Sequence, residues 1–172
     1  MSKPLSRQTL NAMTAGEFTQ ALGAIFEHSP WVAERVAGQR PFASVDQLHA
    51  AMVAAIEAAG EAAQLALLRA HPELAGKAAV RGELTAESTR EQSGAGLSQC
   101  SPEEFAKLQR LNADYNAKFG FPFIVAVRGH TRHSIIALFE QRLSNDPARE
   151  MREGLQQVYR IGLLRLQDLV EA

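Results

Sequence analysis

The chain has 172 residues, of which 46% are hydrophobic and 22% charged, a size and balance typical of one ordinary globular domain. Its formal net charge is −1 and the two signs are mixed along the sequence, which disfavours a nucleic-acid or membrane-surface role. The single cysteine cannot form an internal disulfide and suits a reducing compartment. No apolar stretch approaches the eighteen or so residues of a membrane-spanning helix, and the first residues do not resemble a secretory signal. We therefore expect a cytoplasmic protein with no membrane partner and no nucleic-acid partner.

Helical signals run through most of the sequence. Alanine accounts for 29 residues, while β-branched and aromatic residues are few and scattered. Capping-box patterns at Thr14, Ser44 and Ser101 each precede apolar residues at helical spacing. These patterns predict an all-α, single-domain bundle over residues 1–172, with about seven to nine helices. The clearest of them are expected at residues 14–29, 44–59, 64–70, 85–92, 101–119, 134–143 and 147–170.

Two segments do not have the pattern of a plain helix. Residues 71–96 contain one proline and four glycines, so only short helical pieces fit between them. Residues 120–129 are bounded by Gly120 and Gly129 and are apolar from 121 to 127. No second strand of comparable strength is available to pair with the latter segment. We therefore expect an extended segment near 120–129, packed among helices, whose backbone groups need other hydrogen-bond partners.

The segment 71–96 holds the first candidates for chemistry. His71 precedes Pro72, which disfavours helical geometry and places the histidine at the end of a helix. It could be a proton donor or acceptor, or simply a cap favoured by the helix dipole. Ser88, Glu91 and Gln92 share one face if 85–92 is helical, and they would offer a hydroxyl, a carboxylate and an amide to a polar ligand. The alternative is an ordinary solvated helix face.

Arg165 lies on an apolar stripe of the last expected helix, four residues from both Ile161 and Leu169. A guanidinium in that position needs an anionic partner, for which Glu91 or a ligand carboxylate would serve. Alternatively, Arg165 could bury its methylene groups and extend its charged end to water.

Other candidates are weaker. His130 and His133 could supply two imidazole metal ligands, but they lie in a polar segment without cysteine or carboxylate at a metal-binding spacing. Cys100 precedes an expected helix, whose N-terminus could lower the pKa of its thiol, yet no histidine lies close in sequence. Neither supports a metal site, and we expect none.

Several motifs together carry a resemblance. They are His71-Pro72-Glu73-Leu74-Ala75-Gly76-Lys77, then Ser88-Thr89-Arg90-Glu91-Gln92 with Ala95-Gly96-Leu97, then Leu111-Asn112, Tyr115 and Lys118-Phe119-Gly120-Phe121-Pro122-Phe123-Ile124. In order and spacing this set resembles the family of 2-oxo-4-hydroxy-4-carboxy-5-ureidoimidazoline (OHCU) decarboxylases, and the likeness extends over about 17–170. These enzymes complete the conversion of urate to allantoin. The first motif of the family usually has aspartate where this chain has Glu73, so the carboxylate is kept.

The resemblance implies an all-α carboxy-lyase of purine metabolism, without metal or organic cofactor and often homodimeric. It implies that His71 is the catalytic acid or base, and Glu91 can hold its tautomer. Implied ligand contacts are Pro72, the stretch containing Ser88 and Gln92, and the backbone of Phe123, Ile124, Val125, Ala126 and Val127. We add Arg165 as a further candidate for binding the substrate.

The substrate chemistry requires no external electron sink. Loss of CO2 from C4 leaves an electron pair that the adjacent C5=N imine accepts, and protonation of C5 on one face then gives (S)-allantoin. The protein must orient the carboxylate, stabilise the moving charge and exchange protons. Two alternatives from other classes are a metal-dependent hydrolase of a small cyclic amide, using His71, Glu91, His130 and His133, and a non-enzymatic helical interaction domain with an exposed apolar groove.

Overall fold

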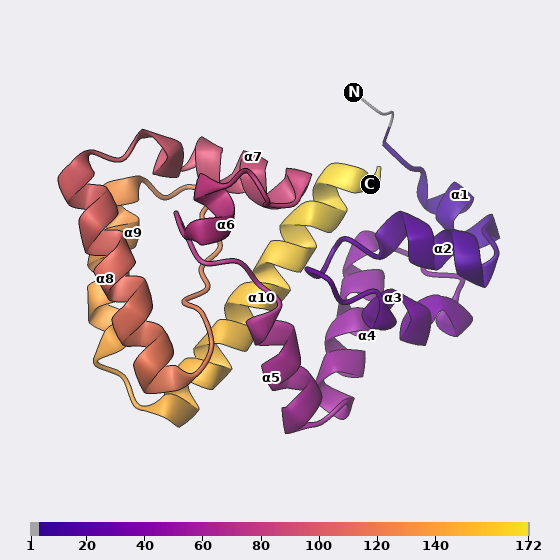
Figure 1. Ribbon diagram of the computed structural model, residues 1–172. Helices are drawn as coiled ribbons and strands as arrows, with labels where there is room; N and C mark the ends of the chain where they lie inside the picture. Colours follow the sequence, from indigo (N-terminus) through magenta and orange to yellow (C-terminus); the bar gives the residue numbers. More distant parts are fainter. Residues whose placement is uncertain (1–3, 172) are drawn as a thin grey trace. The chain divides into compact units, whose positions relative to one another are not determined.

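The computed structural model describes residues 4–171 and is all-α, as expected. Within these residues there is no β-strand, only one isolated parallel bridge between Leu5 and Val170. Figure 1 labels the α-helices along the ribbon. The described residues form ten α-helices and two 3-10 helices. Their bounds are α1 Arg7–Ala12, α2 Ala15–Leu22, α3 Trp31–Val36, η1 Ala37–Gln39, α4 Val45–Ala58, α5 Glu61–Arg69, α6 Lys77–Val80, α7 Ala86–Gly94, η2 Leu97–Gln99, α8 Pro102–Phe119, α9 Arg132–Leu143 and α10 Pro147–Leu169.

The helix starts predicted from capping residues are confirmed. Thr14 and Ser101 form complete capping boxes with Glu17 and Glu104. Ser44 also caps its helix, but the amide of Gln47 accepts from the N–H of Ala43 rather than from that of Ser44. These boundaries follow from side chains within four residues of each other, which is why the local sequence is enough to locate them.

Two expectations about the helices are corrected. The described residues contain ten α-helices rather than seven to nine, because α1, α3 and α6 are only six, six and four residues long. Helices of this length span too few turns to show an apolar period. In addition, the first expected helix ends at Leu22 rather than near Ser29. Ile25 and Phe26 are buried although they lie outside that helix, so apolar spacing extended the predicted helix too far.

The chain divides into two compact units, residues up to 70 together with 158 onward, and residues 71–157. In the first unit α2 packs on α3, α3 on α4, and α4 on α5. Arg40 donates to the carbonyls of Ala37, Leu10 and Met13 and lies over the ring of Phe18. The predicted single domain over 1–172 stays a prediction.

The second unit is built around aromatic rings where α8 packs against α9. The ring of Tyr115 contacts those of Phe119, Phe121, Phe123 and Phe139. The rings of Phe123 and Phe139 are nearly parallel, with centroids 4.0 Å apart. This cluster ties the segment after α8 to both helices of the pair.

The glycine-bounded segment is extended, as predicted. Gly120 ends α8 with a φ of 78°, and Gly129 has a φ of 87°, conformations that favour glycine. Every residue from 121 to 127 is buried. Two of its backbone groups are bound by side chains: Arg142 Nη1 donates to the carbonyl of Ile124 at 2.6 Å, and Gln157 Oε1 accepts from the N–H of Ala126 at 2.9 Å. The carbonyl of Val127 accepts from the backbone N–H of His130 at 2.9 Å.

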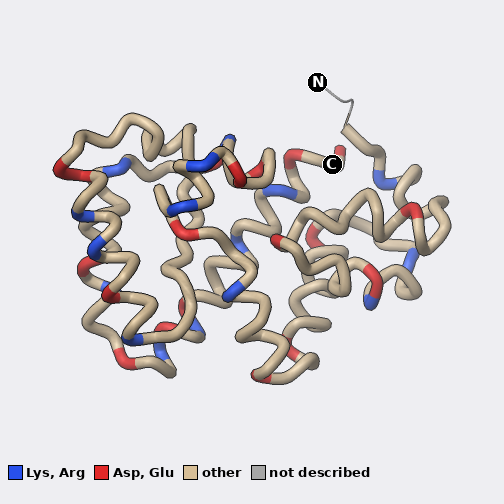
Figure 2. The backbone as a smooth tube through the Cα atoms, viewed as in Figure 1, with Lys and Arg blue, Asp and Glu red and all other residues tan. Residues whose placement is uncertain are grey.

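Charged residues of both signs are interspersed along the backbone within each unit (Figure 2). Among the described residues, no single helix is both long and apolar enough to span a membrane; only α4 and α5 taken together, across a bend of 116°, meet the length and composition criteria.

Candidate active site

The candidate site begins at the loop between α5 and α6, which carries His71. Helix α5 ends at Arg69 and Ala70 is its C-cap, so His71 follows the helix end, as predicted from Pro72. Its side chain is buried, with the residue only 8% exposed. A histidine that only capped a helix end in water would not need this burial, so the loop holds an ionisable ring in an enclosed environment.

The same loop has a tight backbone. Ala75 adopts a φ of 50°, which is uncommon for a residue with a side chain. Gly76 leaves no space for a larger residue, because a Cβ there would lie 2.7 Å from the Cβ of Glu73. Strained backbone of this kind persists only where surrounding groups hold it.

One of those groups is Gln92 on α7. Its Oε1 accepts from the N–H of Ala75 at 2.9 Å, and its Nε2 donates to the carbonyl of Glu73 at 3.2 Å. The side-chain amide of Gln92 therefore hydrogen-bonds to the backbone on both sides of Leu74. Gln92 was expected to bind substrate, and that role stays a prediction; the structure gives it a second role, which is to fix the loop that follows His71.

Helix α8 supplies three more amides to the loop, from positions 109, 112 and 116. The bonds are Gln109 Nε2 to the Ala75 carbonyl (2.6 Å), Asn112 Nδ2 to the Leu74 carbonyl (3.0 Å) and Asn116 Nδ2 to Glu73 Oε1 (2.8 Å). We call these three side chains and Gln92 the amide clamp. Sequence reasoning missed the clamp, although the spacing of the three α8 residues on one helix face was visible. Glu73, which replaces the usual aspartate, is bound by Asn116 rather than left without a partner.

Helix α7 has the face that the sequence predicted. The Thr85 hydroxyl accepts from the N–H of Ser88, and the helix then runs to Gly94. Ser88 and Gln92, four residues apart, are 4% and 6% exposed, and Glu91 is half-buried. A polar face that is buried in this way is not the solvated helix surface that was the alternative.

Arg165 is buried and paired with a carboxylate, as expected. The residue is 6% exposed, and its Nη2 lies 3.0 Å from Oε1 of Glu27, whose side chain is 1% exposed. Its Nη1 also donates to the carbonyls of Ala24 and Ile25. The partner that the structure places there is Glu27, whereas Glu91 or a ligand carboxylate was expected. The alternative of an arginine extending to water is wrong, and the role of Arg165 toward substrate stays a prediction.

We expect Arg165→Ala to lower stability by about 3 to 5 kcal/mol, because it leaves the buried Glu27 carboxylate without its cation. Arg165→Lys keeps the charge but loses the planar fork, so it should cost less stability while still reducing activity clearly. Urea unfolding and turnover measure the two effects, with Arg160→Ala at an exposed position of α10 as the control. Unchanged turnover and unfolding in both variants would remove Arg165 from the site.

A second buried ion pair was not predicted. Arg142 and Glu150 are 4% and 0% exposed, and Arg142 Nη2 lies 3.0 Å from Glu150 Oε2. The hydroxyl of Tyr115 donates to the same carboxylate at 2.5 Å, and Asn145 donates to its other oxygen at 2.9 Å. The sequence contained an indication of this pair. Arg142 lies three residues after Phe139 and therefore on the same helix face, just as Arg165 lies four residues after Ile161.

Electrostatics in this cluster follow from burial and hydrogen bonding. Burial alone would raise the pKa of Glu150, but the hydrogen bonds from Arg142, Asn145 and Tyr115 outweigh it and hold the pKa below its usual range. Burial and the bond to Glu150 raise the pKa of Tyr115 far above that of a free phenol. The cluster therefore holds an ionised carboxylate, an arginine and a neutral phenol at neutral pH.

The weaker candidates from the sequence have local roles. His130 Nδ1 lies 3.0 Å from Oγ of Ser134, and the exposed His133 lies 3.3 Å from Glu104. In the described part of the chain, no three His, Cys, Asp or Glu side chains cluster as a metal site would require. The pKa of the Cys100 thiol is raised by burial and by Glu104, rather than lowered by a helix N-terminus as considered above.

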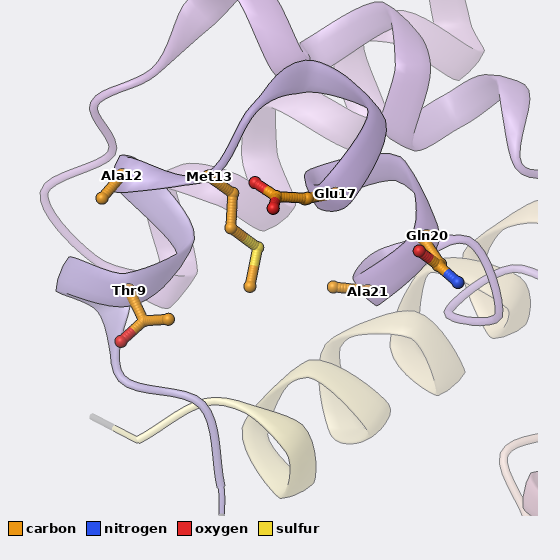
Figure 3. Close-up of a pocket in the computed structure, with 6 residues that line it drawn as sticks. All are labelled: Thr9, Ala12, Met13, Glu17, Gln20 and Ala21. Atoms are coloured by element: carbon orange, nitrogen blue, oxygen red, sulfur yellow. The ribbon is translucent and has the colours of Figure 1, made fainter.

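Two hollows were not predicted from the sequence, and the second of them is lined in part by Gln92. A surface groove of about 640 Å³ between α1 and α2 is lined by Thr9, Ala12, Met13, Glu17, Gln20 and Ala21. Figure 3 shows these six side chains. Its one charged group, Glu17, already accepts from Thr14 in the capping box. A pocket of about 500 Å³ next to α7 is mostly apolar and includes Val80, Cys100 and Phe105. Neither lining includes a histidine, and that of the second pocket includes no carboxylate.

Comparison with known proteins gives one consistent family. The family model described as OHCU decarboxylase matches residues 11–167. A protein of Haloferax volcanii named 2-oxo-4-hydroxy-4-carboxy-5-ureidoimidazoline decarboxylase is 43% identical over 95% of both chains. A human protein with the putative form of that name is 43% identical over 96% of this chain and 95% of its own length.

Solved structures are similar in fold. The crystal structure of an (S)-allantoin synthase superimposes with a TM-score of 0.79 at 29% identity, covering 96% of this chain and 54% of that one. An OHCU decarboxylase crystallised in the presence of (S)-allantoin gives a TM-score of 0.68 at 21% identity, covering 89% of this chain and 96% of that one. The latter likeness concerns the fold alone.

Proposed function

The chain belongs to the OHCU decarboxylase family, and from this premise we propose that it converts 2-oxo-4-hydroxy-4-carboxy-5-ureidoimidazoline to (S)-allantoin and CO2. This is the last step from urate to allantoin. The observation that carries the proposal is the 43% identity to the Haloferax volcanii decarboxylase over nearly the full length of both chains. The buried His71, in a loop held by four amide side chains, supports it from the structure.

The reaction can be divided between substrate and protein. The C4–carboxylate bond breaks, CO2 leaves, and its electron pair forms a C4=C5 bond while the imine nitrogen takes up a proton. The resulting enol then loses its hydroxyl proton as C4=O forms, and C5 gains a proton on one face. Because the imine accepts the electron pair, the protein is needed for orientation, for stabilising the charge and for proton exchange.

In this proposal His71 exchanges the proton at the 4-hydroxyl or at C5, and Glu91 holds the tautomer of its ring. Ser88 and Gln92 bind ureido or ring amide groups, and Pro72 shapes the entry beside the histidine. Burial of His71 supports its role, since a proton donor acts best where water does not compete for it. We further propose that the protein is a cytoplasmic homodimer that needs no cofactor. We also propose that the chain is a single functional domain, which is supported by the match of the family model to residues from both compact units.

The direct test is CO2 release from freshly generated substrate, compared with spontaneous decay. Release that is accelerated by the protein supports decarboxylation. A metal-dependent hydrolase would instead consume the substrate by ring opening with its carboxyl group retained, and an interaction domain would leave the spontaneous rate unchanged.

Replacing Glu91 with glutamine is expected to lower kcat by more than tenfold with little change in KM. The reason is that a carboxylate that orients and stabilises the charged form of His71 acts mainly in the transition state. Steady-state kinetics measure the split, with Glu103→Gln at an exposed position of α8 as the control. A change confined to KM would make Glu91 a binding residue instead.

Exhaustive treatment with EDTA is expected to leave the activity unchanged, because the imine of the substrate supplies the electron sink that a Lewis acid would otherwise provide. Turnover before and after dialysis against the chelator measures this. Loss of activity that returns only on addition of Zn²⁺ would contradict it.

A further inference from the structure

Two side chains outside the implied substrate contacts fix the extended segment. We propose that Gln157 and Arg142 are positioning residues, which hold segment 123–127 at Ile124 and Ala126 and so leave the N–H and C=O of Val125, on the opposite edge, to face the substrate. The inference rests on the proposed function, because it concerns how that reaction's substrate is bound.

The hydrogen-bond pattern has the period of an extended chain. In such a chain the N–H and C=O of one residue point to the same edge, and those of the next residue point to the other edge. Arg142 binds the carbonyl of Ile124 and Gln157 binds the N–H of Ala126, two residues apart. Both bonds therefore lie on a single edge, which is occupied by side chains of α9 and α10.

Arg142 is itself firmly held. Its guanidinium pairs with Glu150, lies 4.4 Å from the ring centre of Phe123, and reaches the Ile124 carbonyl at 2.6 Å. The charged donor makes this bond stronger than one between neutral groups. The hydrogen bond from Arg142 therefore holds the carbonyl of Ile124 in one orientation.

Gln157 is oriented by a second contact. Its Nε2 donates to Oε1 of Glu153 at 3.0 Å, so its own Oε1 is the atom that turns toward the N–H of Ala126. The N–H of Ala126 is therefore already engaged, although the whole stretch 123–127 was implied as substrate-binding backbone. The groups of Val125 point to the opposite edge, and within residues 4–171 neither takes part in a hydrogen bond. Val125 is only 4% exposed, and buried backbone groups need hydrogen-bond partners. An amide or ureide group of a bound substrate would supply a partner for the N–H and for the C=O of Val125.

The test exchanges the two functional groups of the Glu153–Gln157 pair. In Gln157→Glu the new carboxylate lies beside that of Glu153 and is repelled by it. The variant also lacks the Nε2 donor that turns the acceptor oxygen toward Ala126. We expect KM to rise about 3- to 10-fold, which corresponds to the loss of about one hydrogen bond. The double variant Glu153→Gln with Gln157→Glu restores a donor at 153 and an acceptor at 157, and should return KM to within about twofold of wild type. Gln156→Glu carries the same charge change at the exposed neighbouring position and should leave KM unchanged.

A second measurement does not depend on turnover. Amide hydrogen exchange at Ala126 should be slow in the wild type, faster in Gln157→Glu and slow again in the double variant. Wild-type KM in Gln157→Glu, or a double variant with restored exchange and an unrestored KM, would overturn the positioning role. A wild-type protein without decarboxylase activity would contradict the proposed function, while exchange at Ala126 would still decide whether Gln157 holds the segment.

Discussion

Replacing His71 with asparagine is expected to reduce the acceleration of (S)-allantoin formation by about 10²- to 10⁴-fold, the range typical of a lost general acid or base. Asparagine keeps a polar side chain in the buried loop but cannot exchange a proton near neutral pH. The loop itself is held by the amide clamp through backbone groups of residues 73–75 and not through the imidazole. The variant should therefore fold, with only a small change in its thermal midpoint.

The matched control is His133→Asn, since that histidine is exposed and lies at the start of α9. It should keep wild-type turnover. A folded His71→Asn protein that retained near wild-type turnover would remove His71 from the catalytic role.

Replacing Glu150 with glutamine is expected to lower the free energy of unfolding by about 3 to 5 kcal/mol. The change leaves Arg142, 4% exposed, without its counter-charge in the protein interior. Urea unfolding at pH 7 measures it. Glu140→Gln is the control, because its pair with Lys107 is about half exposed and should contribute less than about 1 kcal/mol. Equal stability losses in the two variants would contradict a special role for the buried pair.

The same residue predicts the direction of the acid response. The pKa of Glu150 is lower in the folded protein than the value of about 4.3 for a free glutamate. A group of this kind stabilises the fold fully above the unfolded pKa, and the contribution is lost as the pH falls through the folded pKa. Stability measured from pH 7 downward should therefore fall less steeply below about pH 4.3 in Glu150→Gln than in the wild type. Identical slopes would show that Glu150 does not titrate differently in the two states.

The parts of the fold that the sequence predicts are those set by neighbouring residues. Thr14 and Ser101 mark helix starts because their partners lie three residues away, and Gly120 marks an end because a left-handed residue is needed there. The extended segment 120–129 was predictable because the sequence offers no second apolar stretch of comparable β-strand strength to pair with it.

The parts that were missed depend on residues far apart in the chain. Arg165 had to be paired, but its partner Glu27 lies 138 residues away, and no local pattern indicates that carboxylate. Similarly, Asn112 belongs to the family-like motifs, yet its bond to the Leu74 carbonyl becomes visible only when α8 is packed beside the loop. Periodicity shows which side chains face inward, whereas tertiary packing decides what they contact.

The most direct test of the proposed function is the chirality of the product. Substrate is generated freshly, the protein is added, and the circular dichroism of allantoin is followed over time. Spontaneous decarboxylation protonates C5 from both faces, so its product has no net signal. We expect the protein to produce a rapidly growing signal of (S)-allantoin, and His71→Asn to produce almost none. Racemic allantoin formed at the spontaneous rate in the presence of the wild-type protein would contradict the proposal.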